Sequence, residues 1–276
     1  MVHIDTVTTP RRVNEAYQAR NVFGRRKLYM NWGLWSPNTD ELDDAALALV
    51  LRLGELAGFG PDTTLLDVGF GFGDQLIDWC RHANLGKAEG VNVCPEQTEM
   101  ARRRIADAGF ADRVRVRVGE ATDLPFENDS FDAVTAVECA FHFHTREKFF
   151  RQARRVLRPE GRLVLADFIG LESTSRAQKF AQTVAARAWK FAPGSFCTLD
   201  EYRAQLKNAG FHDISIEVVT DRVIPPGMRY ARRRLHEADV RTRMQPLARV
   251  VTTGILALSG ALGDPLPGEY VLVRAQ

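Results

Sequence analysis

Residues 64–80, TLLDVGFGFGDQLIDWC, constrain the fold of this chain more than any other stretch. The apolar run TLLDV has the length and composition of a short buried strand, and DQLIDWCRHA has the pattern of a helix. Between them, every second residue is a glycine: Gly69, Gly71 and Gly73. Glycine permits a tight turn there and lets a ligand approach the backbone beside the helix N-terminus. The segment therefore predicts a strand, a ligand-binding turn and a helix in succession.

The same order of strand and helix recurs along the chain. Strands are expected at 64–68, 88–93, 113–118, 131–137, 161–168, 213–219 and 269–275, and helices at 40–58, 74–83, 95–109, 146–157 and 199–211. Strands that alternate with helices predict a parallel sheet with helices on both faces. In RVRVRV (113–118) arginines alternate with inward valines, which is typical of a sheet edge.

Composition excludes several classes of protein. Hydrophobic residues make up 45% and charged residues 26%, as in ordinary soluble globular proteins. A net charge of +2 is too small to indicate a nucleic-acid partner. The four cysteines form no CxxC pair, so we expect reduced thiols rather than a metal or redox motif. The start lacks a signal-peptide core, and VVTTGILALSGALG is too short to span a bilayer. We expect a cytoplasmic protein without a membrane span.

The glycine turn also indicates what kind of ligand it binds. A dinucleotide-binding fingerprint would need a third glycine at residue 74, and that residue is Asp74. An acidic side chain beside a diphosphate would be repulsive. The pattern therefore favours a ligand whose contacting part is uncharged or cationic.

The pattern D-x-G-x-G-x-G after a strand resembles the first motif of class I S-adenosylmethionine-dependent methyltransferases. Three further segments resemble later motifs of that family, in the family's order: GVNVCPEQ, GEATDLPFENDSFDAV and RVLRPEGRLVLADF. The resemblance covers roughly residues 60–220 and is greatest to the small-molecule, natural-product branch, with its sugar O-methyltransferases and quinone C-methyltransferases. It implies an α/β, Rossmann-like fold with a mostly parallel seven-stranded sheet, helices on both faces and a helical cap. It also implies S-adenosyl-L-methionine as the cofactor.

Against this family the chain divides into four parts. These are an N-terminal helical lid (1–60), a cofactor-binding core (61–168), a helical cap insertion (169–198), and the rest of the core (199–276) with a second helical insertion at about 226–262. A chain of 276 residues is expected to be one domain with such insertions. The insertions can pair subunits as well as cover a substrate, so the sequence is compatible with a homodimer.

The resemblance also assigns cofactor contacts. It implies that Asp67 and the three glycines hold the methionine part, Asn92 and Gln97 the ribose, Glu120 and Ala121 the adenine, and that Val137 and Glu138 line the methionine side. LYMNWGLW (28–35) resembles the aromatic lid of this branch, in which Tyr29, Trp32 and Trp35 would close over the sulfonium by cation–π attraction. The alternative is that these rings only pack the N-terminal segment onto the core.

Two histidines, in VECAFHFHTREKF, are the candidates for acid–base chemistry. In the sugar O-methyltransferases a histidine after the fourth strand pairs with an aspartate that ends the fifth, here Asp167. Phe141 occupies the position of that histidine, and His142 matches a second, adjacent one. We therefore expect His142 to be the catalytic base and Asp167 its orienting partner. His144 is expected to cap the next helix or face solvent, and no further ligands indicate a metal site.

The predicted activity is methyl transfer to an oxygen or carbon of a small-molecule acceptor. Such a transfer is an in-line displacement that needs a base only when the acceptor is poorly ionised. Two alternatives remain: a cyclase or pericyclase on the same scaffold, and a C-methyltransferase of an isoprenoid diphosphate. In the second case Arg25–Lys27 or Arg232–Arg234 would hold phosphate, although a solvated basic helix face is the preferred interpretation of both runs.

Overall fold

The computed structural model describes residues 23–171, 183, 190–192, 194–244, 246–261 and 268–276. Its sheet contains β1 (Thr64–Val68), β2 (Lys87–Asn92), β3 (Val114–Val118), β4 (Phe131–Val137), β5 (Leu157–Ile169), β6 (Ser215–Val218) and β7 (Glu269–Ala275). The helices are α2 (Leu42–Ala57), α3 (Asp74–His82), α4 (Pro95–Asp107), η1 (a 3-10 turn, Ala140–His142), α5 (Arg146–Val156), α7 (Leu199–Asn208), α8 (Thr220–Arg234), α9 (Ala238–Arg243) and α10 (Pro246–Ala261).

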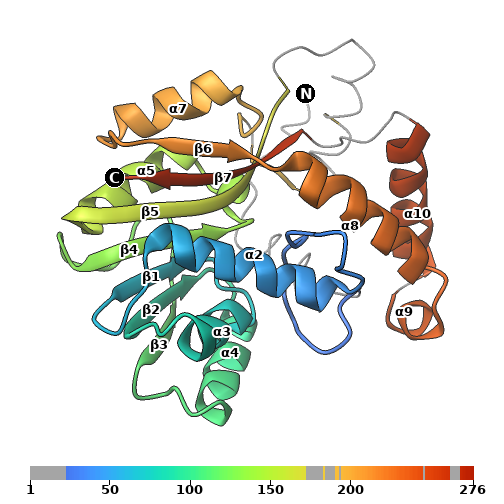
Figure 1. The fold of residues 1–276 in the computed structure, drawn as a ribbon, viewed down its shortest axis with the longest axis horizontal. Helices are drawn as coiled ribbons and strands as arrows, with labels where there is room; N and C mark the ends of the chain where they lie inside the picture. The colour runs from blue at the N-terminus through green and yellow to red at the C-terminus, as the bar shows by residue number, and fades with distance from the viewer. Residues whose placement is uncertain (1–22, 172–182, 184–189, 193, 245, 262–267) are drawn as a thin grey trace, which may run out of the picture.

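The sheet has seven strands in the order β3-β2-β1-β4-β5-β7-β6 (Figure 1). Strands β1 to β5 pair in parallel, and β7 runs antiparallel to both β5 and β6. The mostly parallel seven-stranded sheet that we expected is confirmed. Because parallel strands end at one edge of the sheet, the carboxyl ends of β1, β2 and β4 lie together, where ligands of open α/β sheets bind.

Helices cover both faces of this sheet, because neighbouring strand residues point to opposite sides. Leu65 packs into one core with α2, α3, α4 and α8, whereas Leu66 packs into the other with α5 and α7. Trp79 of α3 is fully buried in the first core, and its indole N–H donates to the carbonyl of Val50 at 2.7 Å. Helix α2 therefore belongs to the layer that covers the sheet, since it contacts α3 and β5.

Strand β3 lies at one edge of the sheet, as its alternating arginines predicted. Val114 and Val116 are buried, while Val118 at the end of the strand is 51% exposed. Helix α2 also ends as predicted, because Gly58 adopts a left-handed φ of 71° and closes the helix with backbone bonds to the preceding turn.

The second helical insertion begins earlier than expected. The sequence placed its start at about 226, after two prolines, but α8 already begins at Thr220 and contains Pro225 and Pro226. Proline has no N–H, so Pro226 leaves the carbonyl of Arg222 without its helical donor. The backbone N–H of Trp35 donates to this carbonyl at 2.8 Å. The helix tolerates the prolines because another segment supplies the missing hydrogen bond.

The N-terminal stretch 24–35, called the lid segment below, lies over the carboxyl edge of the sheet beside α8 (Figure 1). Trp35 is buried, with its ring 5.3 Å from that of Tyr230. A Cβ on Gly227 would lie 2.9 Å from Cε3 of Trp32, so this glycine allows the ring to approach the helix closely. Trp35 therefore packs onto α8, which was our alternative for the aromatic lid.

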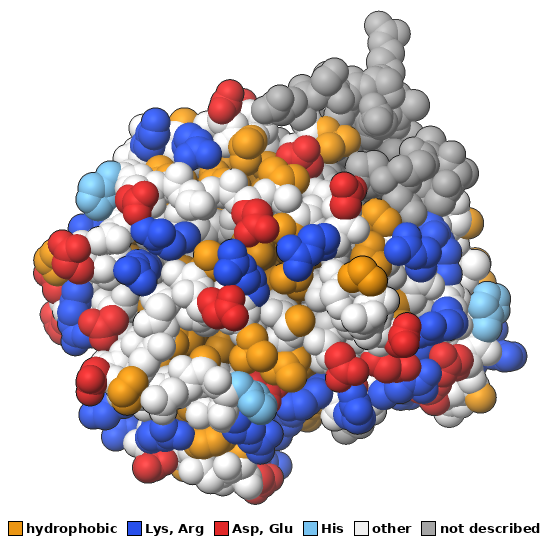
Figure 2. Space-filling model, viewed as in Figure 1, with side chains coloured by type: hydrophobic (Ala, Val, Ile, Leu, Met, Phe, Trp, Pro, Cys, Tyr) orange, Lys and Arg blue, Asp and Glu red, His pale blue; other side chains and the backbone are white. Residues whose placement is uncertain are grey.

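Charges of both signs are mixed over the surface. On the face drawn in Figure 2, lysines and arginines lie among aspartates and glutamates. Arg25 pairs with Glu41 at 2.9 Å and with Glu237 at 2.8 Å, and Arg234 pairs with Asp239 at 2.7 Å. Members of both arginine runs are thus engaged within the protein. Among the described residues, no helix combines the length and apolar character needed to cross a membrane.

The contact between Gly227 and Trp32 predicts that alanine substitutions at two helical glycines change stability in opposite directions. Gly254→Ala in α10 meets open space and should raise the free energy of unfolding by up to about 1 kcal/mol through helix propensity. Gly227→Ala gains the same propensity but forces Trp32 away, and we expect a net loss of about 1 kcal/mol or more. Chemical denaturation followed by tryptophan fluorescence measures both. Equal stabilisation by the two variants would contradict the packing of Trp32 on α8.

Candidate active site

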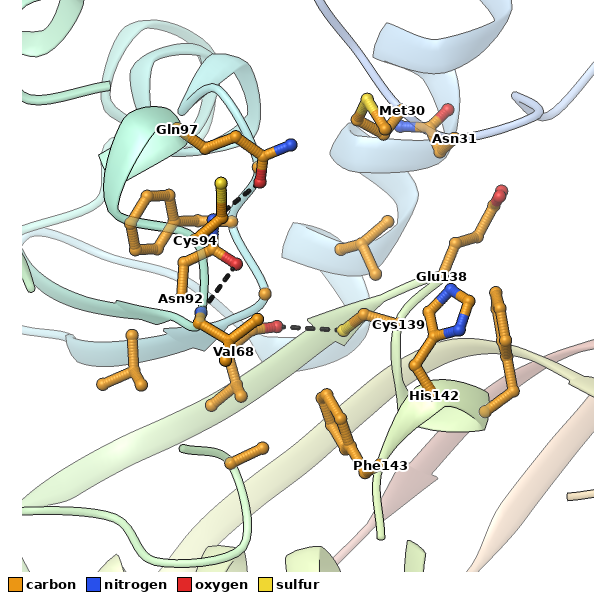
Figure 3. A pocket seen from close by; sticks show the side chains of 18 of the residues that line it. Met30, Asn31, Val68, Asn92, Cys94, Gln97, Glu138, Cys139, His142 and Phe143 are labelled. Atoms are coloured by element: carbon orange, nitrogen blue, oxygen red, sulfur yellow. Dashed lines mark hydrogen bonds between the residues drawn. The ribbon is translucent and has the colours of Figure 1, made fainter. Parts of the chain in front are cut away.

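A cavity of about 430 Å³ lies at the carboxyl ends of β1, β2 and β4, a size typical of small-molecule sites. Figure 3 shows Asn92, Cys94 and Gln97 on one side of it, at the end of β2 and the start of α4. Glu138 and His142 lie on the opposite side, at the end of β4 and in η1. The lid segment closes the cavity with residues that include Tyr29 and Trp32.

The glycine turn forms the floor of the cavity. Gly69, Gly71 and Gly73 have φ values of 78°, 56° and 84°, a left-handed backbone that favours glycine. A Cβ on Gly69 would lie 2.5 Å from Sγ of Cys139, so a side chain is excluded there. Gly69 and Gly71 line the cavity, whereas Gly73 precedes α3 and faces Ala101. The bare backbone of the turn is therefore open to a ligand.

Asp67 lies beneath this floor and is not part of the cavity wall. Its carboxylate is fully buried and accepts hydrogen bonds from Gln75 Nε2 at 3.1 Å and Thr135 Oγ1 at 2.8 Å. Burial raises the pKa of Asp67 to about 7. Gln75 itself lines the cavity. We expected Asp67 to contact the cofactor directly. In the structure it lies behind the cavity wall, where it orients Gln75.

Asn92 and Gln97, expected near the ribose, lie side by side in the cavity wall. The Asn92 amide donates to Oε1 of Gln97 at 2.8 Å, and its own oxygen accepts from the Val93 N–H at 3.1 Å. Both side chains are buried. Helix α4 begins at Pro95, which brings Gln97 in its first turn back toward the end of β2. This pair offers amide groups to the hydroxyls of a sugar.

The residues expected at the adenine and methionine ends also line the cavity. Glu120 and Ala121 follow β3, and Val137 ends β4. Glu138 comes next, with a left-handed φ of 52°. Its Oε1 accepts two hydrogen bonds of 2.7 Å, from the Trp32 N–H and the Tyr270 hydroxyl. Burial raises the pKa of Glu138 to about 8, so the carboxyl is largely protonated at neutral pH.

Further carboxylates of the core hold the lid segment over the cavity. Asp74 accepts from the Leu28 N–H at 3.1 Å and pairs with Arg104 at 2.7 Å. Asp78 accepts from the Lys27 ammonium at 2.9 Å and from the Tyr29 hydroxyl. Asp74 therefore lines the cavity as expected from the altered glycine pattern, but its charge is balanced by arginine.

The cavity wall places no described cationic side chain against a cationic ligand. None of the described residues that line it is a lysine or an arginine, and the titratable groups include Asp74, Glu120 and Glu138. The aromatic face of Trp32 adds attraction for a cation. A bare glycine turn, an amide pair and an acidic, aromatic wall fit S-adenosylmethionine, whose sulfonium carries positive charge.

His142 lies in η1 and lines the cavity. Its Nδ1 is 3.0 Å from the carbonyl oxygen of Lys190. A carbonyl can only accept, so Nδ1 carries the ring proton and the basic lone pair belongs to Nε2. Burial lowers the pKa of His142 to about 4. The ring is therefore neutral at physiological pH.

Asp167 is not the orienting partner of His142, contrary to expectation. It accepts from the Phe168 N–H at 2.9 Å and the Tyr202 hydroxyl at 3.1 Å, and it pairs with Arg146 at 3.0 Å. The reason is the alternation of β5. Phe168 faces the cavity, whereas Asp167 points through to the face covered by α5 and α7. The carbonyl of Lys190 takes the role that we gave to Asp167.

His144 is not a helix cap either. Thr145 is the N-cap of α5 and accepts from the Lys148 N–H at 3.4 Å. His144 instead lines the cavity, where its Nε2 is buried and has no hydrogen-bond partner. Within the described part of the chain, no cluster of three or more His, Cys, Asp or Glu could hold a metal ion.

Several aromatic residues of the wall were missed from the sequence. Phe143, Phe168 and Phe191 all line the cavity, and the Phe141 ring lies 5.3 Å from Phe168 and 4.3 Å from Phe191. Phe168 could have been found, because it ends β5 at the carboxyl edge. Phe191 lies within the first insertion, whose residues 172–182 and 184–189, including Trp189, lie outside the described part of the chain.

Comparison with known proteins identifies the family. A model described as "Methyltransferase domain" matches residues 66–165. Erythromycin 3''-O-methyltransferase of Saccharopolyspora erythraea is 31% identical over 90% of this chain and 83% of that protein. The 27-O-demethylrifamycin SV methyltransferase of Amycolatopsis mediterranei is 32% identical over 83% of this chain and 84% of its own length. The chain belongs to the class I S-adenosylmethionine-dependent methyltransferases. It groups with their natural-product branch.

Solved structures show the same fold. The [4+2]-cyclase SpnF matches with a TM-score of 0.77 at 20% identity, covering 97% of this chain and 96% of that one. A geranyl diphosphate methyltransferase, in complex with GPP and sinefungin, matches with a TM-score of 0.76 at 19% identity, covering 96% and 98%. The methyltransferase described here uses S-adenosylmethionine and acts on a small-molecule acceptor, as the sequence predicted.

The glycine turn gives a matched test of cofactor binding. Gly69→Ala and Gly109→Ala both place alanine at a left-handed φ, at a cost of about 1–2 kcal/mol. Only Gly69→Ala also meets a neighbour, the Cys139 thiol; Gly109 faces open space. We expect Gly69→Ala to weaken binding of S-adenosylhomocysteine at least tenfold in calorimetry and Gly109→Ala to leave it unchanged. Unchanged binding in both variants would show that the glycine turn does not contact the cofactor.

The buried carboxyls predict how stability depends on pH. The pKa of Glu138 is raised from 4.5 to about 8, and that of Asp67 from 3.8 to about 7. The folded state therefore holds these protons more tightly, and the stability that they contribute is lost as pH rises toward those values. His142 has the opposite effect on stability. Because its pKa is lowered from 6.5 to about 4, the stability that it contributes is lost as pH falls from 6.5 toward 4.

Between pH 6.5 and 8.5 we therefore expect the free energy of unfolding to fall with rising pH. Glu138→Gln keeps an acceptor for the Trp32 N–H but has no titrating proton, so its stability should fall less over the same range. Chemical denaturation at three pH values measures both slopes. Identical slopes for the parent and Glu138→Gln would show that Glu138 does not titrate in this window.

Proposed function

We propose that this methyltransferase O-methylates a hydroxyl group of a large, mostly apolar secondary metabolite. The observation that carries the proposal is the composition of the cavity wall around η1. It combines a cluster of phenylalanine rings with two histidines, His142 and His144, and contains no described lysine or arginine. Such a wall suits an uncharged acceptor whose reacting group must give up a proton.

The aromatic rings favour an acceptor with extensive apolar surface. The Phe141 ring packs edge to face on Phe168 at 5.3 Å and on Phe191 at 4.3 Å, and the rings of Phe168 and Phe191 lie tilted to each other at 6.0 Å. Trp32 of the lid segment lines the same cavity. Rings held in this way offer rigid apolar area at little cost in conformational entropy. They also exclude water from the reacting atoms, which methyl transfer requires.

The charges argue against a diphosphate acceptor. A diphosphate needs cations or a metal for binding, yet no described lining residue is a lysine or an arginine, and no described cluster of three or more His, Cys, Asp or Glu could hold a metal ion. The arginine runs that we considered as phosphate ligands are engaged elsewhere: Arg25 with Glu41 and Glu237, and Arg234 with Glu237 and Asp239. This charge pattern favours O-methylation over isoprenoid C-methylation.

His142 would act as the base. S-adenosylmethionine supplies a methyl group on a positively charged sulfur. The acceptor oxygen forms a bond to the methyl carbon as the sulfur–carbon bond breaks, and its proton passes to Nε2 of His142. The Lys190 carbonyl keeps the proton on Nδ1, so Nε2 presents its lone pair. S-adenosylhomocysteine is the second product.

The sequence relatives agree with this acceptor class. Two are the erythromycin and rifamycin O-methyltransferases named above, and a third is methyltransferase GfsG of Streptomyces halstedii, 30% identical over 79% of this chain and 78% of its own length. The likeness to a [4+2]-cyclase and to geranyl diphosphate methyltransferases concerns the fold alone.

The test is an assay with libraries of polyketide lactones, glycosides and isoprenoid diphosphates. We expect S-adenosylhomocysteine release together with a product that carries one added methyl group on a hydroxyl of an uncharged acceptor. Methylation of geranyl diphosphate alone would overturn the proposed acceptor class. Conversion of a substrate without S-adenosylhomocysteine release would indicate a cyclase instead.

Replacing His142 tests the base. His142→Ala should lower kcat about 10²- to 10⁴-fold and leave the affinity for S-adenosylhomocysteine unchanged. In the parent enzyme, the acid limb of kcat/KM should fall near pH 4 rather than 6.5, because burial lowers the pKa of His142. His144→Ala is the matched comparison in the same wall. Near-normal turnover of His142→Ala would indicate catalysis by proximity alone.

A further inference from the structure

We propose that Arg146, through its buried ion pair with Asp167, is a positioning residue for the acceptor side of the cavity. It fixes residues 190–192 and 194–198, called the wall stretch below, which carry both Phe191, an aromatic wall residue, and the carbonyl that orients His142. The inference rests on the proposed acceptor site and assigns a different role to Asp167 from the one that the family resemblance implied.

The Arg146 side chain joins two separate segments to its own helix. Its Nη1 donates to the carbonyl of Ser195 at 3.0 Å, and its Nη2 donates to the carbonyl of Phe168 at 3.1 Å. Its Nε lies 3.0 Å from Oδ2 of Asp167. The side chain is only 3% exposed, so water cannot substitute for these contacts. One planar group thus sets the distance between the end of β5 and the wall stretch.

A second layer holds the guanidinium itself in place. The Tyr202 hydroxyl of α7 donates to Asp167 at 3.1 Å, and the Tyr202 ring lies 5.0 Å from the guanidinium carbon. The Phe168 N–H donates to the other oxygen of Asp167 at 2.9 Å. Arg146, Asp167 and Tyr202 all lie outside the cavity wall. They can affect an acceptor only through the residues that they position.

The wall stretch is joined to the candidate base by short contacts. The Ala192 N–H and the Ser195 hydroxyl both donate to the carbonyl of Phe141, at 2.9 and 2.7 Å. The Lys190 carbonyl meets Nδ1 of His142 at 3.0 Å. The Phe191 ring packs on Phe141 at 4.3 Å. A displacement of this stretch therefore moves the aromatic wall and the imidazole together.

Energetics favour positioning over simple stabilisation. A buried ion pair recovers little more than the free energy lost on removing both charges from water, whereas loss of one partner is strongly destabilising. The planar fork of arginine, unlike the ammonium of lysine, binds several acceptors in one fixed geometry. Here it satisfies two carbonyls and one carboxylate at once. The glycine turn, which lies between β1 and α3, shares none of these contacts.

The experiment compares Arg146→Met, Asp167→Asn, the double variant and Arg146→Lys. Arg203→Met is the control, because Arg203 donates to the Ile214 carbonyl at 2.8 Å on the far helix α7. We expect Arg146→Met to raise KM for the acceptor and lower kcat, each at least tenfold, with S-adenosylhomocysteine affinity within twofold of the parent. Arg146→Lys should not restore either value. Arg203→Met should lower the thermal midpoint without changing the acceptor kinetics.

The double variant separates positioning from stability. It leaves no uncompensated buried charge, so its thermal midpoint should exceed that of Arg146→Met while its KM and kcat stay impaired. If kinetics follow the thermal midpoint through the whole series, or if Arg146→Lys behaves as the parent, the positioning role is overturned.

An NMR titration of His142 makes the outcome independent of the acceptor. In Arg146→Met we expect the His142 imidazole to lose its contacts with Lys190 and Phe191. Its pKa should then rise from about 4 toward 6.5. If this shift occurs while the parent methylates no hydroxyl, the proposed function fails and the positioning role stands. If the parent methylates its acceptor and Arg146→Met changes neither the titration nor the kinetics, the positioning role fails alone.

Discussion

The close approach of β1 and β4 at their carboxyl ends is the constraint on which the site depends. A side chain on Gly69 would collide with the Cys139 thiol, so the glycine turn and the end of β4 can meet only through a bare backbone. The Gly69 N–H donates to the carbonyl of Val91 at 2.7 Å, which ties the end of β2 into the same arrangement. Cofactor and acceptor walls are thus built from strand ends whose separation the sheet determines.

Carboxyl groups of the core then hold the lid segment over this edge of the sheet. Glu138, Asp74 and Asp78 accept hydrogen bonds from the lid segment, and Arg222 of α8 offers it the carbonyl that a proline has left unpaired. The pKa of Glu138 rises because this closure buries its carboxyl group.

Much of the fold and of the cofactor site could be predicted because both depend on local pattern. The strand–turn–helix at residues 64–83, the pairing of Asn92 with Gln97 in one wall, and the edge position of β3 follow from periodicity and strand-end position. The acceptor side could not be predicted in the same way. Asp167 lies at the expected position along β5. Because side chains alternate between the two faces of a strand, however, it points to the face on which it pairs with Arg146.

The sequence by itself determined the order of elements, the glycine turn and the family, since these require only neighbouring residues and their spacing. The tertiary structure alone decided what His142 contacts, because Lys190 lies 48 residues away. It also decided that His144 faces the cavity while Thr145 caps the helix, and that Pro225 and Pro226 lie inside α8. The contact of His142 and the prolines of α8 depend on hydrogen-bond partners from distant segments, and no local pattern records where those partners will be.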